Sequence, residues 1–63
     1  MCDWQQGDEA VVLLPGCSLD GLPLEFVSRR ATGLLFRLAQ SRGVYRAGDL
    51  VRLKQDEVVR PAV

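Results

Sequence analysis

Short apolar segments, separated by turn residues roughly every 8–12 positions, constrain the fold of this chain most strongly. Within these segments the apolar residues alternate or run in short blocks, a pattern typical of half-buried strands. The sequence therefore predicts an all-β fold, a small barrel or sandwich. The predicted strands are residues 9–14, 18–27, 34–38, 44–46 and 50–53.

The length of the chain limits what these strands can build. With 63 residues there is room for one domain, which we divide into a short N-terminal segment (1–7), a barrel (8–54) and a C-terminal tail or edge strand (55–63). A domain of this size buries only roughly 60% of its unfolded surface, so it usually needs disulfides, a metal or self-association. We expect self-association to supply the missing stability.

The two cysteines argue against the other two sources. Cys2 and Cys17 form no CxxC pair, and the chain has no histidine, so a zinc site lacks ligands. We expect both thiols to be free and reduced, Cys17 to be partly buried, and the protein to be cytoplasmic.

Gly21 lies inside the second predicted strand, five residues after the Pro15-Gly16 turn. Glycine weakens the interior of a strand, so its presence there predicts a sharp bend where another backbone passes closely. Five strands can close a barrel only if the long ones bend in this way. The expected fold class is thus a small five-stranded, strongly bent barrel.

The net charge is zero, but the two halves of the chain differ in sign. Residues 1–28 hold five acidic residues and no basic one, whereas residues 29–54 hold seven basic residues and one acidic one. Such asymmetry indicates an anionic partner. It is also compatible with charge balance inside the molecule, or with subunits that pair through opposite faces.

Enzymatic function finds little support in the sequence. Without histidine, neither a Ser-His nor a Cys-His nucleophile pair can be built. No phosphate-cradling glycine loop is present. The longest apolar run, residues 10–15, is far shorter than a membrane span. We therefore expect no catalytic activity, no cofactor and no membrane partner.

The aromatic residues are assigned mainly to the core. We expect Phe26 and Phe36 to be buried and Trp4 to close one mouth of the barrel. A lone tyrosine on a strand, Tyr45, is expected in the core or at an interface.

Arg29 and Arg30 are the most informative local feature, because two guanidinium groups in the expected loop 28–33 can stack on unpaired bases and bind phosphate. The alternative interpretation is a solvated loop, or salt bridges to Glu25 and Asp20.

The spacing of Gly16, Leu19, Gly21 and Phe26 resembles the first motif of the Sm-like family, which includes the Sm, LSm and Hfq proteins. Residues 45–53 are similar to its second motif, with Arg46, Leu50 and Leu53 at matching positions. The chain departs from the family where Val27 replaces an acidic residue and Ala47 replaces a glycine, and it lacks the second-motif histidine of Hfq.

The resemblance implies an Sm-like (SH3-like) barrel that assembles into a ring of identical subunits and binds short single-stranded RNA, such as a U-rich stretch. In such rings the loops after the second and fourth strands meet at the pore. The resemblance therefore implies RNA contacts from Ser28, Arg29, Arg30, Arg46 and Gly48.

Two alternatives stay open. Residues 15–30 also resemble the Sm-like bacterial inhibitor of the Rho termination factor, which implies a protein-binding regulator that uses the acidic first half. The chain could equally be an SH3-like or PilZ-like adaptor, although residues 28–33 lack the acidic residue and the serine spacing of the PilZ motif for cyclic dinucleotides.

Overall fold

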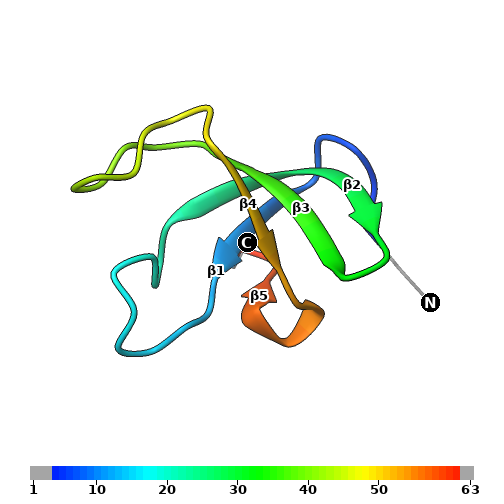
Figure 1. The fold of residues 1–63 in the computed structure, drawn as a ribbon, viewed down its shortest axis with the longest axis horizontal. Helices are drawn as coiled ribbons and strands as arrows, with labels where there is room; N and C mark the ends of the chain where they lie inside the picture. Colours follow the sequence, from blue (N-terminus) through cyan, green and yellow to red (C-terminus); the bar gives the residue numbers. More distant parts are fainter. Residues whose placement is uncertain (1–3, 62–63) are drawn as a thin grey trace.

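The computed structural model describes residues 4–61, which form one antiparallel sheet. The order of the strands across the sheet is β4-β3-β2-β1-β5 (Figure 1). A single turn of 3-10 helix, η1, connects β4 to β5. The elements are β1 (Glu9–Val12), β2 (Pro23–Arg30), β3 (Gly33–Leu38), β4 (Leu50–Leu53), η1 (Gln55–Glu57) and β5 (Val58–Val59).

The sheet does not close into a barrel. Its edges are β4 and β5, and no ladder joins these two strands within residues 4–61. The prediction of an all-β fold with five strands is confirmed, and the prediction of a closed barrel is wrong. The two edge strands have only four and two residues, and both residues of β5 pair along one side with Val11 and Val12 of β1.

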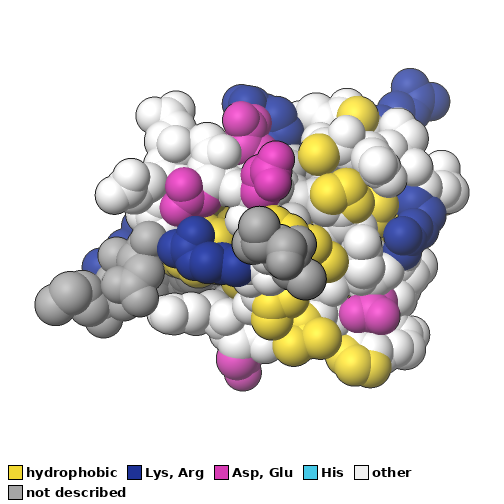
Figure 2. All heavy atoms as spheres, turned by 180° about the vertical axis from the view of Figure 1, so that it is seen from behind, with side chains coloured by type: hydrophobic (Ala, Val, Ile, Leu, Met, Phe, Trp, Pro, Cys, Tyr) yellow, Lys and Arg dark blue, Asp and Glu magenta, His cyan; other side chains and the backbone are white. Residues whose placement is uncertain are grey.

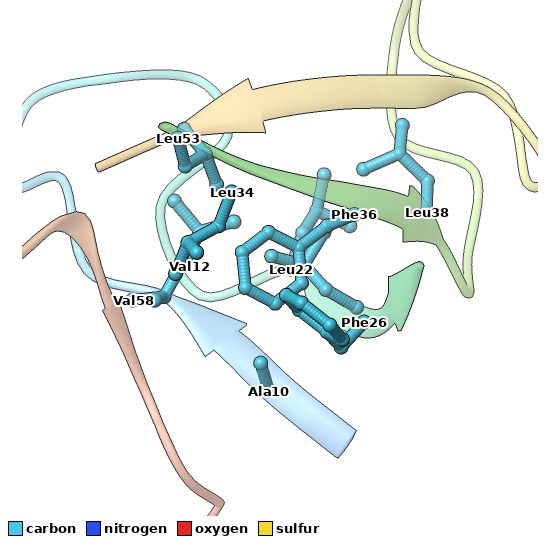
Figure 3. Packing of buried hydrophobic residues seen from close by; sticks show 10 residues of the cluster. Ala10, Val12, Leu22, Phe26, Leu34, Phe36, Leu38, Leu53 and Val58 are labelled. Carbon is cyan, nitrogen blue, oxygen red and sulfur yellow. The ribbon is translucent and has the colours of Figure 1, made fainter. Parts of the chain in front are cut away.

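The core lies against one face of the sheet and follows the two-residue period of the strands. Phe36 and Leu22 are fully buried at its centre, and Figure 3 shows side chains from β1, β2, β3 and β4 converging there. The buried residues are Ala10, Val12, Leu22, Leu24, Phe26, Leu34, Phe36, Leu38, Leu53 and Val58.

Trp4 covers one end of this core, although the described strands form no closed barrel whose mouth it could fill, and the expected burial of Phe26 and Phe36 is confirmed. The Trp4 ring stacks on Phe26 with the centroids 6.2 Å apart and meets Phe36 edge-on at 5.6 Å. The guanidinium of Arg60 lies over the indole, 4.3 Å from the ring centroid. Residues from the two ends of the described chain thus close the core together. Tyr45 is half-buried against the same core.

A β-bulge at Val27 bends the longest strand. Phe26 pairs with Phe36 of β3, but the next pair is Ser28 with Leu35, so Val27 is the extra residue. An extra residue twists a strand and shifts its alternation by one. As a result, Phe26 and Arg29 lie on the core face of the sheet, while Ser28 and Arg30 lie on the outer face.

Gly21 does not lie in a strand, and its predicted role is wrong. Residues 18–21 form a turn, closed by a hydrogen bond of 3.0 Å from the Leu22 amide to the Leu19 carbonyl. A Cβ at Gly21 would meet only the Arg42 guanidinium, at 4.0 Å. Its φ of +83° is the reason for glycine, because other residues strain there. Proline at position 23 starts β2 directly after this turn.

The remaining strand predictions differ in their success. Residues 9–14, 34–38 and 50–53 correspond to β1, β3 and β4, and the edge-strand alternative for the C-terminal tail is confirmed by β5. Residues 28–30 belong to β2 rather than to a loop, because the turn to β3 needs only two residues. Residues 44–46 form no strand; one bridge pairs Tyr45 with Arg42 inside the loop 39–49. Within residues 4–61, no helix has the length and apolar character needed to cross a membrane.

Candidate nucleic-acid interface

Basic side chains gather at the end of the sheet where β2 turns into β3. Arg29 and Arg30 end β2, and Arg52 and Lys54 lie at the end of β4, which runs beside the start of β3. We call Arg29, Arg30, Thr32, Arg52 and Lys54 the hairpin corner. Figure 1 shows the β2–β3 turn and the end of β4 at this one end of the sheet.

The cations of the hairpin corner are not neutralised by carboxylates. Within residues 4–61, the ion pairs join Arg37 to Glu25 at 3.2 Å and Arg60 to Asp8 at 3.3 Å. The predicted alternative, salt bridges from Arg29 and Arg30 to Glu25 and Asp20, is therefore not formed. Glu25 binds Arg37 instead, and the Asp20 carboxylate accepts a hydrogen bond of 2.9 Å from the Leu14 amide.

Arg29 and Arg30 leave β2 on opposite faces. Arg29 pairs with Leu34, whose side chain is buried, so Arg29 lies on the core face but is exposed at the end of the strand. Arg30 pairs with Gly33 and lies on the outer face. Adjacent residues of a strand alternate between faces, so these two guanidinium groups cannot act as a side-by-side pair in a loop.

Arg52 shares the outer face with Arg30. It pairs with Leu35 of β3, which alternates with the buried Leu34 and Phe36. Its guanidinium donates a hydrogen bond of 3.1 Å to the hydroxyl oxygen of Thr32 in the β2–β3 turn. To reach Thr32, the side chain of Arg52 passes Gly33, with its Cγ only 3.4 Å from the place of a Cβ there.

Ser28 adds an unusual polar atom to the same face. Its hydroxyl oxygen is buried and has no hydrogen-bond partner in the described part of the chain. The residue pairs with Leu35, so it lies in one row across the sheet with Leu35 and Arg52. The structure thus places Ser28, Arg30 and Arg52 on one face, of which the sequence pointed to the first two, while Arg29 lies at the same end of the sheet on the core face.

Arg46 and Gly48 lie at the opposite end of β3. The Gly48 amide donates to the carbonyl of Leu38, the last residue of β3, at 2.8 Å, and the Arg46 amide donates to the Asp49 carboxylate at 3.2 Å. The length of β3, roughly 17 Å at about 3.4 Å per residue, separates them from Arg30. A single copy of the chain therefore does not bring the two expected groups of RNA contacts together.

Arg42 fixes the loop at that opposite end. Its guanidinium donates to the carbonyl oxygens of Asp20 and Ser18 and so ties loop 39–49 to the turn before β2. Cys17, between β1 and that turn, is a free thiol and is exposed, so the prediction that it is partly buried is wrong. Cys2 lies outside the described residues.

Acidic residues lie around β1 and the first half of β2, on the outer face that also carries Arg30 and Arg52. Glu9 of β1 pairs directly with Glu25 of β2, and Asp8 precedes β1. Like charges directly opposite each other destabilise a sheet. Figure 2 shows several acidic side chains close together on one face, with basic side chains both beside them and toward the margins of the view. The ion pair between Arg37 and Glu25 joins the acidic and the basic part of the sequence, so the separation of charge is only partial in the folded chain.

Sequence reasoning missed Arg52 and Lys54. The sequence held a signal for Arg52, because alternation along the predicted strand 50–53 places it on the face opposite to Leu53. Its hydrogen bond to Thr32 could not be predicted, because it requires the two-residue turn between β2 and β3. The described residues form no surface pocket and no cluster of three potential metal ligands. Comparisons with family models, curated proteins and solved structures found no match for this chain.

Proposed function

We propose that this chain is a ring-forming, Sm-like protein that binds short single-stranded RNA through the hairpin corner. The observation that carries the proposal is the group of four cationic side chains, from Arg29, Arg30, Arg52 and Lys54, that form no ion pair within residues 4–61. Cations left without carboxylates at one end of a sheet are suited to phosphate groups.

The chemistry of the corner favours single strands over duplex. Three of its cations are arginines, which bind phosphate with a planar fork and stack on unpaired bases. The net charge of the chain is zero, and acidic residues such as Glu9 and Glu25 lie on the same sheet. A long duplex would meet these acidic residues, whereas a short single strand can be confined to the corner.

The two open edges of the sheet support self-association. Both β4 and β5 pair on one side only, and each carries an exposed apolar side chain, with Leu50 55% and Val59 40% accessible. Unpaired strand edges pair readily with another chain. Pairing β4 of one copy with β5 of the next would repeat around a ring and repeat the hairpin corner with it.

The proposal is tested by the binding of the unsubstituted protein to a fluorescently labelled ten-residue oligouridylate at low salt. Fluorescence anisotropy should show saturable binding that is tighter than binding to a duplex DNA of the same length. Light scattering on the same sample should show a multiple of the 7.0 kDa chain. Absence of RNA binding at low salt would overturn the proposal, and a monomer would overturn the ring.

The pairing of Glu9 with Glu25 favours a second candidate, a protein-binding regulator such as an inhibitor of the Rho termination factor. Arg37 already compensates for Glu25 of this pair, whereas Glu9 forms no ion pair within residues 4–61 and is the carboxylate that a basic partner would bind. In that case the protein should bind purified Rho, and the substitutions Glu9→Lys and Glu25→Lys should abolish the binding. Those substitutions should leave RNA binding intact or strengthen it if the first proposal holds.

A further inference from the structure

We propose that Arg30 and Arg52 together bind one phosphodiester group of single-stranded RNA on the outer face of the sheet, and that Thr32 orients Arg52 for this contact. The inference rests on the proposed function and goes beyond it by assigning a particular site and a positioning residue. It also excludes Arg29 from that site, although Arg29 adjoins Arg30 in the sequence.

The bulge at Val27 is what places the two arginines on one face. Without the extra residue, the alternation from the buried Phe26 would carry Arg30 to the core face and Arg29 to the outer face. With it, Arg30 pairs with Gly33 on the same face on which Arg52 pairs with Leu35.

Gly33 lets the two guanidinium groups approach each other. Arg30 and Arg52 belong to strands on either side of β3, and a side chain between them would keep them apart. Gly33 has none, and the stem of Arg52 passes over it, within 3.4 Å of the missing Cβ, toward Thr32. The Arg52 side chain therefore reaches the position on β3 that lies directly beside Arg30.

Thr32 holds Arg52 in place with a single hydrogen bond. The hydroxyl oxygen accepts from one terminal nitrogen, Nη1, at 3.1 Å. A guanidinium group has five N–H donors, so the others stay available for a ligand. An arginine already held by one bond loses less rotamer entropy when it binds phosphate, and this raises affinity.

The site also suits the rest of a nucleotide. Neither arginine forms an ion pair within residues 4–61, so no carboxylate competes with the phosphate. Leu35 is half-buried in the same row as Arg52 and offers an apolar surface against which an unstacked base can pack. The ligand class is thus a phosphodiester next to an unpaired base.

A double-mutant cycle on oligouridylate binding tests the shared phosphate. Arg30→Gln and Arg52→Gln should each lower the affinity on the order of tenfold. The loss of affinity in the double variant should be smaller than the product of the two single losses, because both substitutions remove contacts with the same phosphate. Arg29→Gln, on the core face, and Arg46→Gln, at the other end of β3, are the matched controls. Each should lower the affinity less than about threefold, because neither arginine contacts the shared phosphate.

Thr32 gives a second, independent test. Thr32→Val keeps the shape but removes the acceptor and should weaken binding on the order of threefold, while Thr32→Ser should restore it. In the Arg52→Gln background, Thr32→Val should have no effect, which a purely structural role of Thr32 would not produce. Circular dichroism spectra would establish that each variant is folded.

The outcomes separate this inference from the proposed function. If the unsubstituted protein binds no RNA, both are overturned. If it binds RNA but Arg29, Arg30, Arg46 and Arg52 contribute equally and additively, RNA binding stands and the two-arginine site is overturned. Equal effects of Thr32→Val with and without Arg52 would overturn the positioning role.

Discussion

Gly33 lies against the backbone of β4, and a Cβ on this glycine would be only 3.0 Å from the carbonyl oxygen of Leu53. This is the close backbone approach that sequence reasoning assigned to Gly21. It occurs at the first residue of β3, where φ is +148°. The glycine thereby lets β4 run close to the β2–β3 turn.

The two glycines should therefore differ when they are replaced by alanine. Gly33→Ala combines an unfavourable φ with a backbone contact that cannot relax easily and should lower the free energy of unfolding by about 2–3 kcal/mol. Gly21→Ala has space and should cost about 1–2 kcal/mol, from its φ of +83° alone. Urea denaturation followed by Trp4 fluorescence measures both. A larger loss at Gly21 would contradict the assignment.

Arg42 should matter for stability although it is exposed. Its hydrogen bonds to the carbonyl oxygens of Ser18 and Asp20 tie two loops together. Arg42→Met keeps the apolar stem and removes these bonds, and we expect a loss of about 1 kcal/mol. Arg46→Met is the matched control, because the Arg46 side chain forms no hydrogen bond or ion pair in residues 4–61. Equal melting temperatures for the two variants would refute the role of Arg42.

Trp4 should contribute to stability through the aromatic cluster. It stacks on Phe26 and meets Phe36 edge-on, so Trp4→Ala should cost about 2–3 kcal/mol, less than a fully buried tryptophan because Trp4 is half-buried. Trp4→Phe should recover most of this loss. The denaturation midpoint in urea, read by circular dichroism, decides the matter. An unchanged midpoint for Trp4→Ala would show that the indole does not help to close the core.

Much of the strand pattern could be predicted, because alternating apolar residues identify β1, β3 and β4 directly. The Gly21 error has a physical cause. Leu19 and Leu22 look like strand residues, but the turn 18–21 is set by glycine φ and by backbone hydrogen bonds that no periodicity reveals. The bulge at Val27 could not be predicted from the sequence either, since it depends on how β2 pairs with β3.

The candidate site was predicted only in part for the same reason. Arg29 and Arg30 were recognisable as a basic pair, but treating residues 28–33 as a loop hid their separation onto two faces. Arg52 became part of the site only through its bond to Thr32 across Gly33, which requires the register of three strands. Arg46 and Gly48 were grouped with the pair by resemblance, and the length of β3 separates them.

Self-association should depend on the exposed apolar side chains at the two edges. Lysine on an edge strand opposes pairing with another chain. Leu50→Lys and Val59→Lys should therefore each convert the oligomer to monomers, with little effect on the melting of the monomer because both positions are exposed. Gln40→Lys, in the loop that follows β3, adds the same charge at an exposed position outside both edge strands and is the control. An unchanged mass in light scattering for both edge variants would contradict assembly through β4 and β5.

The central claim, that the hairpin corner binds single-stranded RNA, is tested most directly by the salt dependence of oligouridylate binding. Each phosphate contact on a single strand contributes roughly −0.7 to the slope of log K against log salt concentration. In a variant with glutamine at positions 29, 30, 52 and 54, the slope should become less negative by about 2, because Arg30 and Arg52 share one phosphate and the four cations contact at most about three. A variant with glutamine at positions 42 and 46 should keep the slope of the unsubstituted protein. Equal slopes for the two variants and the unsubstituted protein would contradict the claim.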